Sequence, residues 1–233
     1  MKPKSPFYLL LLAALLIDIC PAITQEIFFN KVFSLEGKVF SHVSGITQDA
    51  QGFMWFATKK GLFKYDGYQM TSYTNNPDDT NSLATNALEA ICVDSSGILW
   101  IGTLGQGLER FDPATGIFTH FRHDPKDPAR LSSDWVHALL VDQEGSLWAG
   151  TERGLDRFDA QTGKFINFRN RPNDPTSLSC NAVVAIYEDK QTTLWIGTGS
   201  VYGGNDDEGG LNRMDKRPGH LPPTCMILKI HSA

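Results

Sequence analysis

Four tryptophans, Trp55, Trp100, Trp148 and Trp195, stand in four copies of one short motif. The copies read "DAQGFMWFAT", "DSSGILWIGT", "DQEGSLWAGT" and "DKQTTLWIGT", and each is followed by a Gly-Leu pair and then by "KYD", "RFD", "RFD" or "RMD". Successive copies are separated by about 45 residues, a period that is typical of repeat architectures such as β-propellers. A chain with this internal repeat is expected to fold as an array of similar units.

Each unit divides into four short strands, as the second copy illustrates. Its segments "EAICVD", "ILWIGT", "GLERFD" and "IFTHF" are apolar or alternate apolar with polar residues, which is the pattern of β-strands. The Asp, Gly and Pro residues between them favour tight turns. Four strands in a unit of about 40–45 residues are typical of a propeller blade. The sequence therefore predicts an all-β fold, an incomplete β-propeller of about three and a half four-stranded antiparallel blades over residues 25–216.

The strand that contains the tryptophan is apolar on both faces. In the second copy, Leu99 and Ile101 point to one side of the sheet and Trp100 points to the other, because side chains alternate along a strand. Stacked blades cover both faces, and one tryptophan buries about 150–250 Å². We therefore assign the four repeat tryptophans to the core between blades. A role as sugar-stacking platforms is the weaker alternative, because they occupy the same position in every repeat.

Residues 1–24 are predicted to be a secretory signal peptide. Lys2 and Lys4 precede an apolar run from Phe7 to Ile17, and cleavage near Ala22 fits such a segment. The run is shorter than the roughly 20 residues that a membrane-spanning helix needs, and an uncleaved anchor is the alternative. No transmembrane helix is predicted elsewhere, and we expect the chain in the periplasm or outside the cell.

Composition argues against several classes of function. The formal net charge of -5 disfavours a nucleic-acid partner, which usually requires a clustered basic face. None of the four cysteines belongs to a C-x-x-C pair, so neither a zinc site nor a redox pair is predicted. No catalytic constellation, metal site or cofactor-binding motif is identified. We therefore predict that the chain is not an enzyme and holds no cofactor.

Long connections rich in Asp, Asn, Pro and Ser follow the fourth strand of each unit, for example "RHDPKDPARLSSDWV". In an up-and-down blade they emerge at the same end as the turn between the second and third strands, and loops on a rigid scaffold commonly carry binding residues. Candidate contacts on this face are Arg122, His123, Asp124 and Arg171. The loop sequences place His123 in register with Asn76 and Arg171. A lyase-like enzyme is the disfavoured alternative, because a fold alone assigns no chemistry.

The combined pattern resembles the two-component regulator propeller family. The resemblance rests on "DSSGILWIGT", "GLERFD" and "TGIFTHFRHDPKDP" and extends from Phe33 to about Lys216. Members of that family are large bacterial sensors. Two seven-bladed propellers and a β-sandwich lie in the periplasm, followed by a transmembrane helix and a histidine kinase or diguanylate cyclase. The resemblance implies an oligosaccharide or another periplasmic ligand, and dimers among full-length relatives.

The second propeller, the membrane helix and the kinase of that family have no counterpart in this sequence. We therefore predict an N-terminal fragment of a periplasmic ligand-sensing propeller that belongs to two-component signal transduction and does not signal alone. None of the six histidines is carried over as a phosphoacceptor. The alternative is a stand-alone secreted module that binds glycans or proteins.

Residues 217–233 do not continue the repeat, and a frameshift near Lys216 is the predicted cause. When the tail is back-translated and read in the frame that starts one nucleotide earlier, permitted codons encode a sequence similar to residues 115–128. Because methionine has a single codon, the reading at Met226 must give an aspartate, and the repeat has an aspartate at that position. A genuine C-terminal extension is the alternative. The genomic DNA beyond codon 216 is expected to encode further blades, a membrane span and a kinase in a shifted frame. An adjacent frame without repeat text would contradict this prediction.

Overall fold

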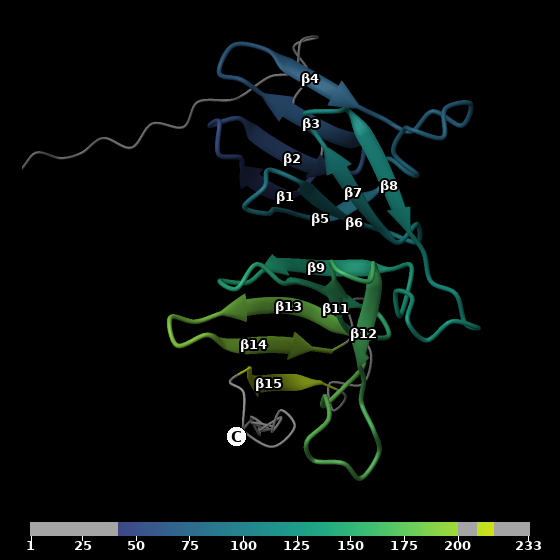
Figure 1. Cartoon of the computed structure of the whole chain (residues 1–233), viewed down its shortest axis with the longest axis vertical. Helices are drawn as coiled ribbons and strands as arrows, with labels where there is room; N and C mark the ends of the chain where they lie inside the picture. The colour runs from purple at the N-terminus through teal and green to yellow at the C-terminus, as the bar shows by residue number, and fades with distance from the viewer. Residues whose placement is uncertain (1–41, 200–208, 217–233) are drawn as a thin grey trace, which may run out of the picture. The chain divides into compact units, whose positions relative to one another are not determined.

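The structure, a computed structural model, describes residues 42–199 and 209–216, and every regular element in them is a β-strand (Figure 1). The predicted all-β class is therefore confirmed. Within these residues no helix is long and apolar enough to cross a membrane. The predicted signal peptide, residues 1–24, and the tail, residues 217–233, lie outside the described residues.

The strands form four separate sheets. The first sheet contains β1 (Val43–Gln48), β2 (Met54–Thr58), β3 (Gly61–Tyr65) and β4 (Met70–Tyr73). The second contains β5 (Leu88–Val93), β6 (Leu99–Thr103), β7 (Leu108–Asp112) and β8 (Ile117–Phe121). The third contains β9 (Val136–Val141), β10 (Leu147–Thr151), β11 (Gly154–Asp159) and β12 (Lys164–Phe168). The fourth contains, in the described residues, β13 (Val183–Glu188), β14 (Thr193–Thr198) and β15 (Gly210–Asp215).

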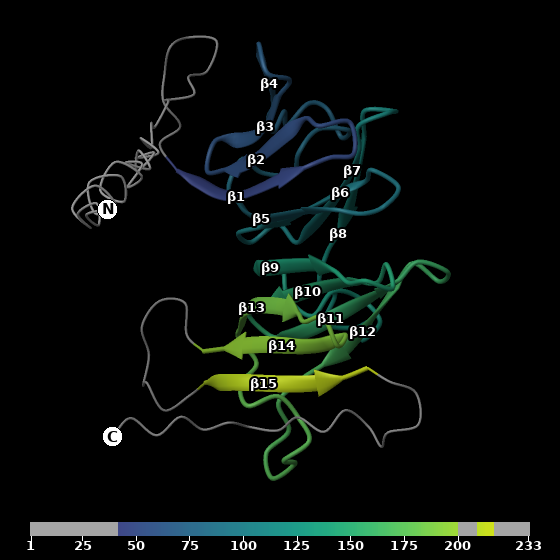
Figure 2. The same cartoon turned by 90° about the vertical axis from the view of Figure 1, so that its left-hand side faces the viewer.

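Consecutive strands pair within each sheet, so every sheet is an antiparallel meander. The first strands of the sheets contact one another in the order β1, β5, β9 and β13, and Figures 1 and 2 show them following one another. Sheets that pair only internally and pack face to face along one series of inner strands are the blades of a β-propeller. The predicted blade architecture is therefore confirmed.

An Asp–Trp clasp, the hydrogen bond from the repeat tryptophan to the aspartate six residues earlier, closes the first hairpin of every blade. In the second blade, Asp94 Oδ1 accepts the backbone N–H groups of Ser96 (2.9 Å) and Ile98 (3.1 Å), and its Oδ2 accepts the indole N–H of Trp100 (3.0 Å). The same Trp–Asp bonds are Trp55–Asp49 (2.7 Å), Trp148–Asp142 (2.7 Å) and Trp195–Asp189 (2.8 Å). One carboxylate thus caps the turn and satisfies an indole that would be costly to bury unpaired.

Three apolar clusters lie between neighbouring blades, and each contains one repeat tryptophan. The first combines Trp55 with Leu99 and Ile101 of the next blade. The other two repeat this arrangement one blade further on: Trp100 with Leu147 and Ala149, and Trp148 with Leu194 and Ile196. Trp195 in the fourth blade is half-buried and belongs to none of these clusters of described residues. Each of the three clustered indoles therefore packs against the blade that follows it in the chain.

Lys216, directly after β15, fastens the fourth blade to the third. Its Nζ donates to Asp142 Oδ2 (2.7 Å) and to Glu188 Oε1 (2.6 Å), and all three side chains are nearly buried. Burial alone would lower the pKa of Lys216, but the hydrogen bonds and charges of the two carboxylates outweigh it and raise that pKa. The amine thus stays charged and links the clasp of the third blade to β13 of the fourth.

A glycine in the second strand lets the next blade approach closely. A Cβ added at Gly150 would lie 2.6 Å from Val183 Cγ1 and 3.0 Å from the Val183 carbonyl oxygen, both in the fourth blade. Gly102 stands in the same relation to Val136, at 2.8 Å from its Cγ1. At Gly197 the nearest atom would be the Cβ of Ala185 in the same blade, at 3.3 Å. The close contact between blades therefore depends on the absence of a side chain at two of these positions.

Gly150→Ala is expected to lower the free energy of unfolding by about 1–3 kcal/mol, because the added methyl group collides with Val183 in a packed interface. Gly197→Ala is the matched control in the same strand position and is expected to change that free energy by less than about 0.5 kcal/mol. Urea titrations followed by tryptophan fluorescence measure both. Equal losses in the two variants would contradict the packing described between the third and fourth blades.

Candidate functional site

The turns between second and third strands lie at the same end of the blades as the long connections. The backbone N–H of Gly107, in the β6–β7 turn, donates to the carbonyl of Asp134 in the connection that follows β8 (2.8 Å). In the next blade, Glu152 N–H of the β10–β11 turn donates to the carbonyl of Trp135 (3.1 Å). Both turns are thus bonded to the segment that enters β9.

The connections share one side-chain anchor, which includes His123. Its Nδ1 lies 2.8 Å from the Leu131 carbonyl oxygen, to which a protonated Nδ1 donates. The neighbouring connections have the same bond. In the preceding one, Asn75 Nδ2 donates to the carbonyl of Leu83 (2.6 Å), and in the following one, Asn170 Nδ2 donates to the carbonyl of Leu178 (2.5 Å). The predicted register was therefore wrong by one residue, because these bonds equate His123 with Asn75 and Asn170 and not with Asn76 and Arg171. His123 holds its loop together.

The other three predicted contacts have different surroundings. Asp124 caps the loop, where its Oδ1 accepts the backbone N–H of Lys126 (2.9 Å). Arg171 is exposed and lies 3.7 Å from the Asp174 carboxylate. Arg122 is half-buried, and its charge acts on the buried carboxylate of Glu109. These residues share the loop end but do not converge on one point.

Three blades carry a buried polar residue on the third strand that was not predicted from the sequence. These residues, Glu109, Asp156 and Asn212, occupy the same position in successive blades, and each is completely buried. The first blade has Phe63 at this position. In the motifs "GLFKYD", "GLERFD", "GLDRFD" and "GLNRMD" this position is the third letter, and it varies between polar residues and phenylalanine. The alternation of polar and apolar residues along a strand does not distinguish a buried polar residue from a polar residue that is exposed to solvent.

Asp156 fastens the connection between the second and third blades to the third sheet. Its Oδ2 accepts both the backbone N–H and the hydroxyl of Ser132 (2.8 Å each), and its Oδ1 accepts Nδ2 of Asn167 (2.6 Å). Ser132 Oγ also lies 2.7 Å from Thr151 Oγ1. Burial raises the pKa of the Asp156 carboxyl to about 6, although these hydrogen bonds and the charge of Arg169 lower it. Asn212 repeats this arrangement without charge, since its Oδ1 accepts the Ser179 N–H (2.8 Å).

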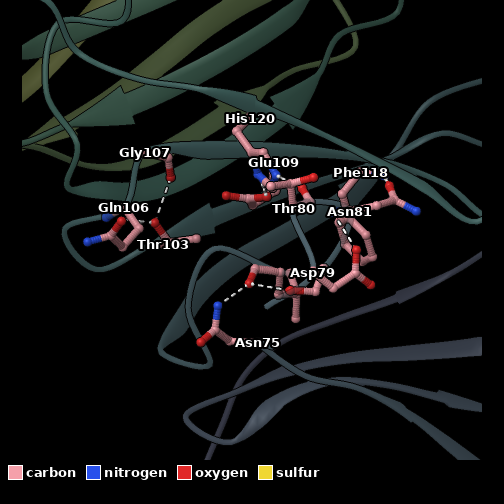
Figure 3. A network of polar contacts seen from close by, with 12 residues as sticks. Asn75, Asp79, Thr80, Asn81, Thr103, Gln106, Gly107, Glu109, Phe118 and His120 are labelled. Carbon is pink, nitrogen blue, oxygen red and sulfur yellow. Dashed lines mark hydrogen bonds and ion pairs between the residues drawn. The ribbon is translucent and has the colours of Figure 1, made fainter. Parts of the chain in front are cut away.

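Glu109 forms the corresponding network in the second blade (Figure 3). Its Oε2 lies 2.5 Å from His120 Nδ1, and His120 Nε2 lies 3.1 Å from the carbonyl oxygen of Thr80. Beside it, the Asn81 side-chain oxygen accepts the backbone N–H of Phe118 (2.8 Å). Burial raises the pKa of Glu109, against the opposing effect of His120. The pair joins the connection that follows the first blade to β7 and β8.

Two cavities open beside Asp156, on either side of Asn167 and Arg169, which line both. The larger measures about 250 Å³ and lies against the connection that contains His123 and Asp124. The smaller measures about 180 Å³ and includes Arg171. Three of the four predicted loop contacts thus line a cavity, and Arg122 lines neither.

His123 and the buried carboxylates at this end of the blades are engaged in hydrogen bonds that hold loops. Toward the opposite end, near the β5–β6 turn, burial raises the pKa of the Cys92 thiol to about 12, which leaves it un-ionised. Among the described residues no group of three or more His, Cys, Asp or Glu side chains has a metal-binding arrangement. The absence of enzymatic activity stays a prediction.

Blades of this kind are found in known proteins. Residues 82–105, 130–153 and 177–200 match the family model for the two-component regulator propeller. The extracellular domain of a hybrid two-component system from Bacteroides thetaiotaomicron is 30% identical, with a TM-score of 0.65, over 76% of this chain and 23% of that one. Histidine kinase P4 from Formosa agariphila is 38% identical over 56 residues, 24% of this chain and 4% of that protein. The chain thus spans about a quarter of the solved domain and a small part of the kinase.

Virginiamycin B lyase from Staphylococcus aureus shares the fold alone, at 16% identity and a TM-score of 0.51, over 80% of this chain and 56% of the lyase. The meandering sheets, the Asp–Trp clasps and the loop end define the class as a β-propeller whose long connecting loops lie at one end of the blades. Its repeats are those of the two-component regulator propeller family, as the three matched segments show.

Asp156→Asn is expected to remove a pH dependence of stability. The folded-state pKa of about 6 exceeds the ordinary 3.8, so this carboxyl stabilises the fold below pH 3.8 and loses that contribution as pH rises to about 6. The loss amounts to about 3 kcal/mol at most, since one pKa unit corresponds to about 1.4 kcal/mol. Urea titrations at pH 4 to 7.5 should show a smaller decline in the variant, which can keep the Ser132 bond as Asn212 keeps its own.

The reciprocal variant Asn212→Asp is the matched control, because it places a carboxylate at the same buried position of the fourth blade. It is expected to lower the free energy of unfolding at pH 7.5 and to introduce a new decline between pH 4 and 6. Identical pH profiles for the natural chain and Asp156→Asn would show that another group causes the dependence.

Proposed function

We propose that these blades are the ligand-sensing, extracellular part of a two-component sensor and that the ligand is an oligosaccharide. The observation that carries the proposal is the 30% identity, over 76% of this chain, with an extracellular domain of a hybrid two-component system. The predicted signal peptide at residues 1–24 agrees with an extracellular or periplasmic location. The match to a histidine kinase adds support from a second sensor protein.

The geometry suits a sensor whose blades act as a scaffold. A side-chain hydrogen bond from His123, Asn75 or Asn170 holds each connection, so the position of each loop tip is fixed relative to its blade. A ligand bound there contacts two blades at once, because each connection joins one blade to the next. In this proposal the blades alone do not signal, and an effector segment of the kind found in the resembled family carries the output.

Two measurements on the natural system test this function. The chain, located by fractionation of the source cells, is expected in the periplasmic or extracellular fraction. The purified chain is expected to bind one class of oligosaccharide on a glycan array, with saturable binding confirmed by calorimetry. A cytoplasmic location, or an array without any bound glycan, would contradict the proposal.

Transcription separates a sensor from a stand-alone binding module. Deletion of the gene is expected to abolish the transcriptional response of the source organism to the bound oligosaccharide, since a sensor couples binding to gene expression. Binding that persists while the deletion leaves transcription unchanged would assign the chain to the secreted binding modules instead.

A further inference from the structure

The cavities beside Asp156 are lined by arginines from three segments of the chain. Arg130 comes from the connection between the second and third blades, Arg153 from the β10–β11 turn, and Arg169 from the residue after β12. Arg171 extends the series into the smaller cavity. We call the two adjoining cavities the arginine crevice. Each cavity is smaller than the pocket of about 300–1,000 Å³ that encloses a drug-sized ligand, so each suits a single sugar residue or its charged group.

Two of these arginines have no acidic partner in the part of the chain that the structure describes. Among the described residues, no carboxylate lies within ion-pair distance of Arg153 or Arg169, whereas Arg130 pairs with Asp127 (3.4 Å) and Arg171 pairs with Asp174 (3.7 Å). Arg169 acts on Asp156 only through its longer-range charge. An unpaired guanidinium presents planar, paired donors that suit a carboxylate or a sulfate group.

The acidic residues of the crevice are already engaged by the protein. Asp124 Oδ1 accepts the Lys126 N–H (2.9 Å), and Asp127 Oδ1 accepts the Ala129 N–H (3.0 Å). Asp156 lies beneath the surface with its oxygens directed to Ser132 and Asn167. The two linings together carry four arginines, Arg130, Arg153, Arg169 and Arg171, against three aspartates, Asp124, Asp127 and Asp174, and this excess of positive charge favours an anion.

An exposed tryptophan adjoins the same turn. Trp135 is 39% exposed, and its carbonyl accepts the N–H of Glu152, the residue before Arg153 (3.1 Å). One edge of its indole lies against Gly105, at 3.6 Å from the position of an added Cβ. On the other side of this turn, the Cγ of Arg169 lies 3.1 Å from the equivalent position of Gly154. The β10–β11 turn thus contacts the backbone of Trp135 and the aliphatic stem of Arg169.

We propose that the arginine crevice binds an acidic saccharide, with its carboxylate or sulfate group on Arg153 and Arg169 and a sugar ring against Trp135. Trp135 lines neither cavity, but its backbone contacts the turn that carries Arg153, so a ligand larger than an inorganic anion is needed to reach both, and a sugar ring with an anionic substituent meets this requirement. This inference rests on the proposed function and narrows its ligand from oligosaccharides in general to acidic ones.

Calorimetry of the full chain with three saccharides tests the inference. The probes are an oligogalacturonide, a sulfated galactose disaccharide and a neutral galactose oligomer, each at 50 and 300 mM NaCl. One of the two acidic probes is expected to bind, more weakly at the higher salt concentration because the contact is ionic. The two acidic probes distinguish a carboxylate ligand from a sulfate ligand.

Arg153→Ala and Arg169→Ala are each expected to weaken that binding about 10- to 100-fold, since each removes hydrogen bonds to a charged group. Trp135→Ala should weaken it about 5- to 10-fold through lost ring contact. Lys164→Ala is the control, because it removes one exposed positive charge at the opposite end of β12. It should leave affinity unchanged, and all four variants should melt within a few degrees of the natural chain.

The outcomes separate this inference from the proposed function. Binding of the neutral oligomer with an affinity that the arginine variants do not change would overturn the acidic ligand and leave the sensor proposal standing. Acidic binding that Lys164→Ala weakens as much as Arg169→Ala does would overturn the crevice as its site. No binding of any saccharide, here or on the glycan array, would overturn both proposals.

Discussion

The hydrogen bond from each repeat indole to the turn aspartate six residues earlier sets the geometry on which the other contacts depend. A tryptophan that is buried between two sheets needs a partner for its N–H, and the aspartate supplies one while its other oxygen closes the hairpin. The indole is thereby held against the next blade, as Trp100 is held against Leu147. The same carboxylate in the third blade also accepts Lys216. Turn, strand and interface are thus coupled through one side chain per blade.

The buried position on the third strand shows how far this frame tolerates different chemistry. Glu109, Asp156 and Asn212 differ in charge and length, yet each fastens an incoming connection to its sheet. Asn212 makes this contact without charge, whereas burial raises the pKa of Glu109 and Asp156. A carboxylate costs stability near neutral pH at such a position, and the cost is offset only in part by its hydrogen bonds. Asp156 and Asn212 both accept a backbone N–H of the connection, whereas Glu109 reaches it through His120, so more than one residue type holds the connection.

These differences explain which features the sequence predicts. Trp100 and its turn are recognisable because their spacing recurs in every copy, and both faces of the strand are apolar. The register of His123 is not recognisable, because neighbouring Asn, Asp and Arg letters fit two alignments, and only the bond to the Leu131 carbonyl selects one. The arginine crevice is not predictable from a linear pattern at all. Arg153 and Arg169 come together because β11 and β12 pair as a hairpin, and Trp135 joins them through a backbone contact.

Repetition and recognition are therefore assigned to different parts of a blade. The strands of a blade pack against the neighbouring blades, so a change at Gly150 or Trp148 affects an interface that repeats along the array. The ends of the strands have no such restriction, provided that the anchor shared by His123, Asn75 and Asn170 is kept. A family of sensors can then change its ligand by replacing side chains beside a constant anchor without altering the blades. On this view, a loop-end residue that differs between blades is a candidate for ligand contact, since packing would select the same residue in each blade. Arg153 is such a residue, because Lys60 and Gln106 occupy its position in the preceding blades, whereas Arg169 recurs in the second blade as Arg122.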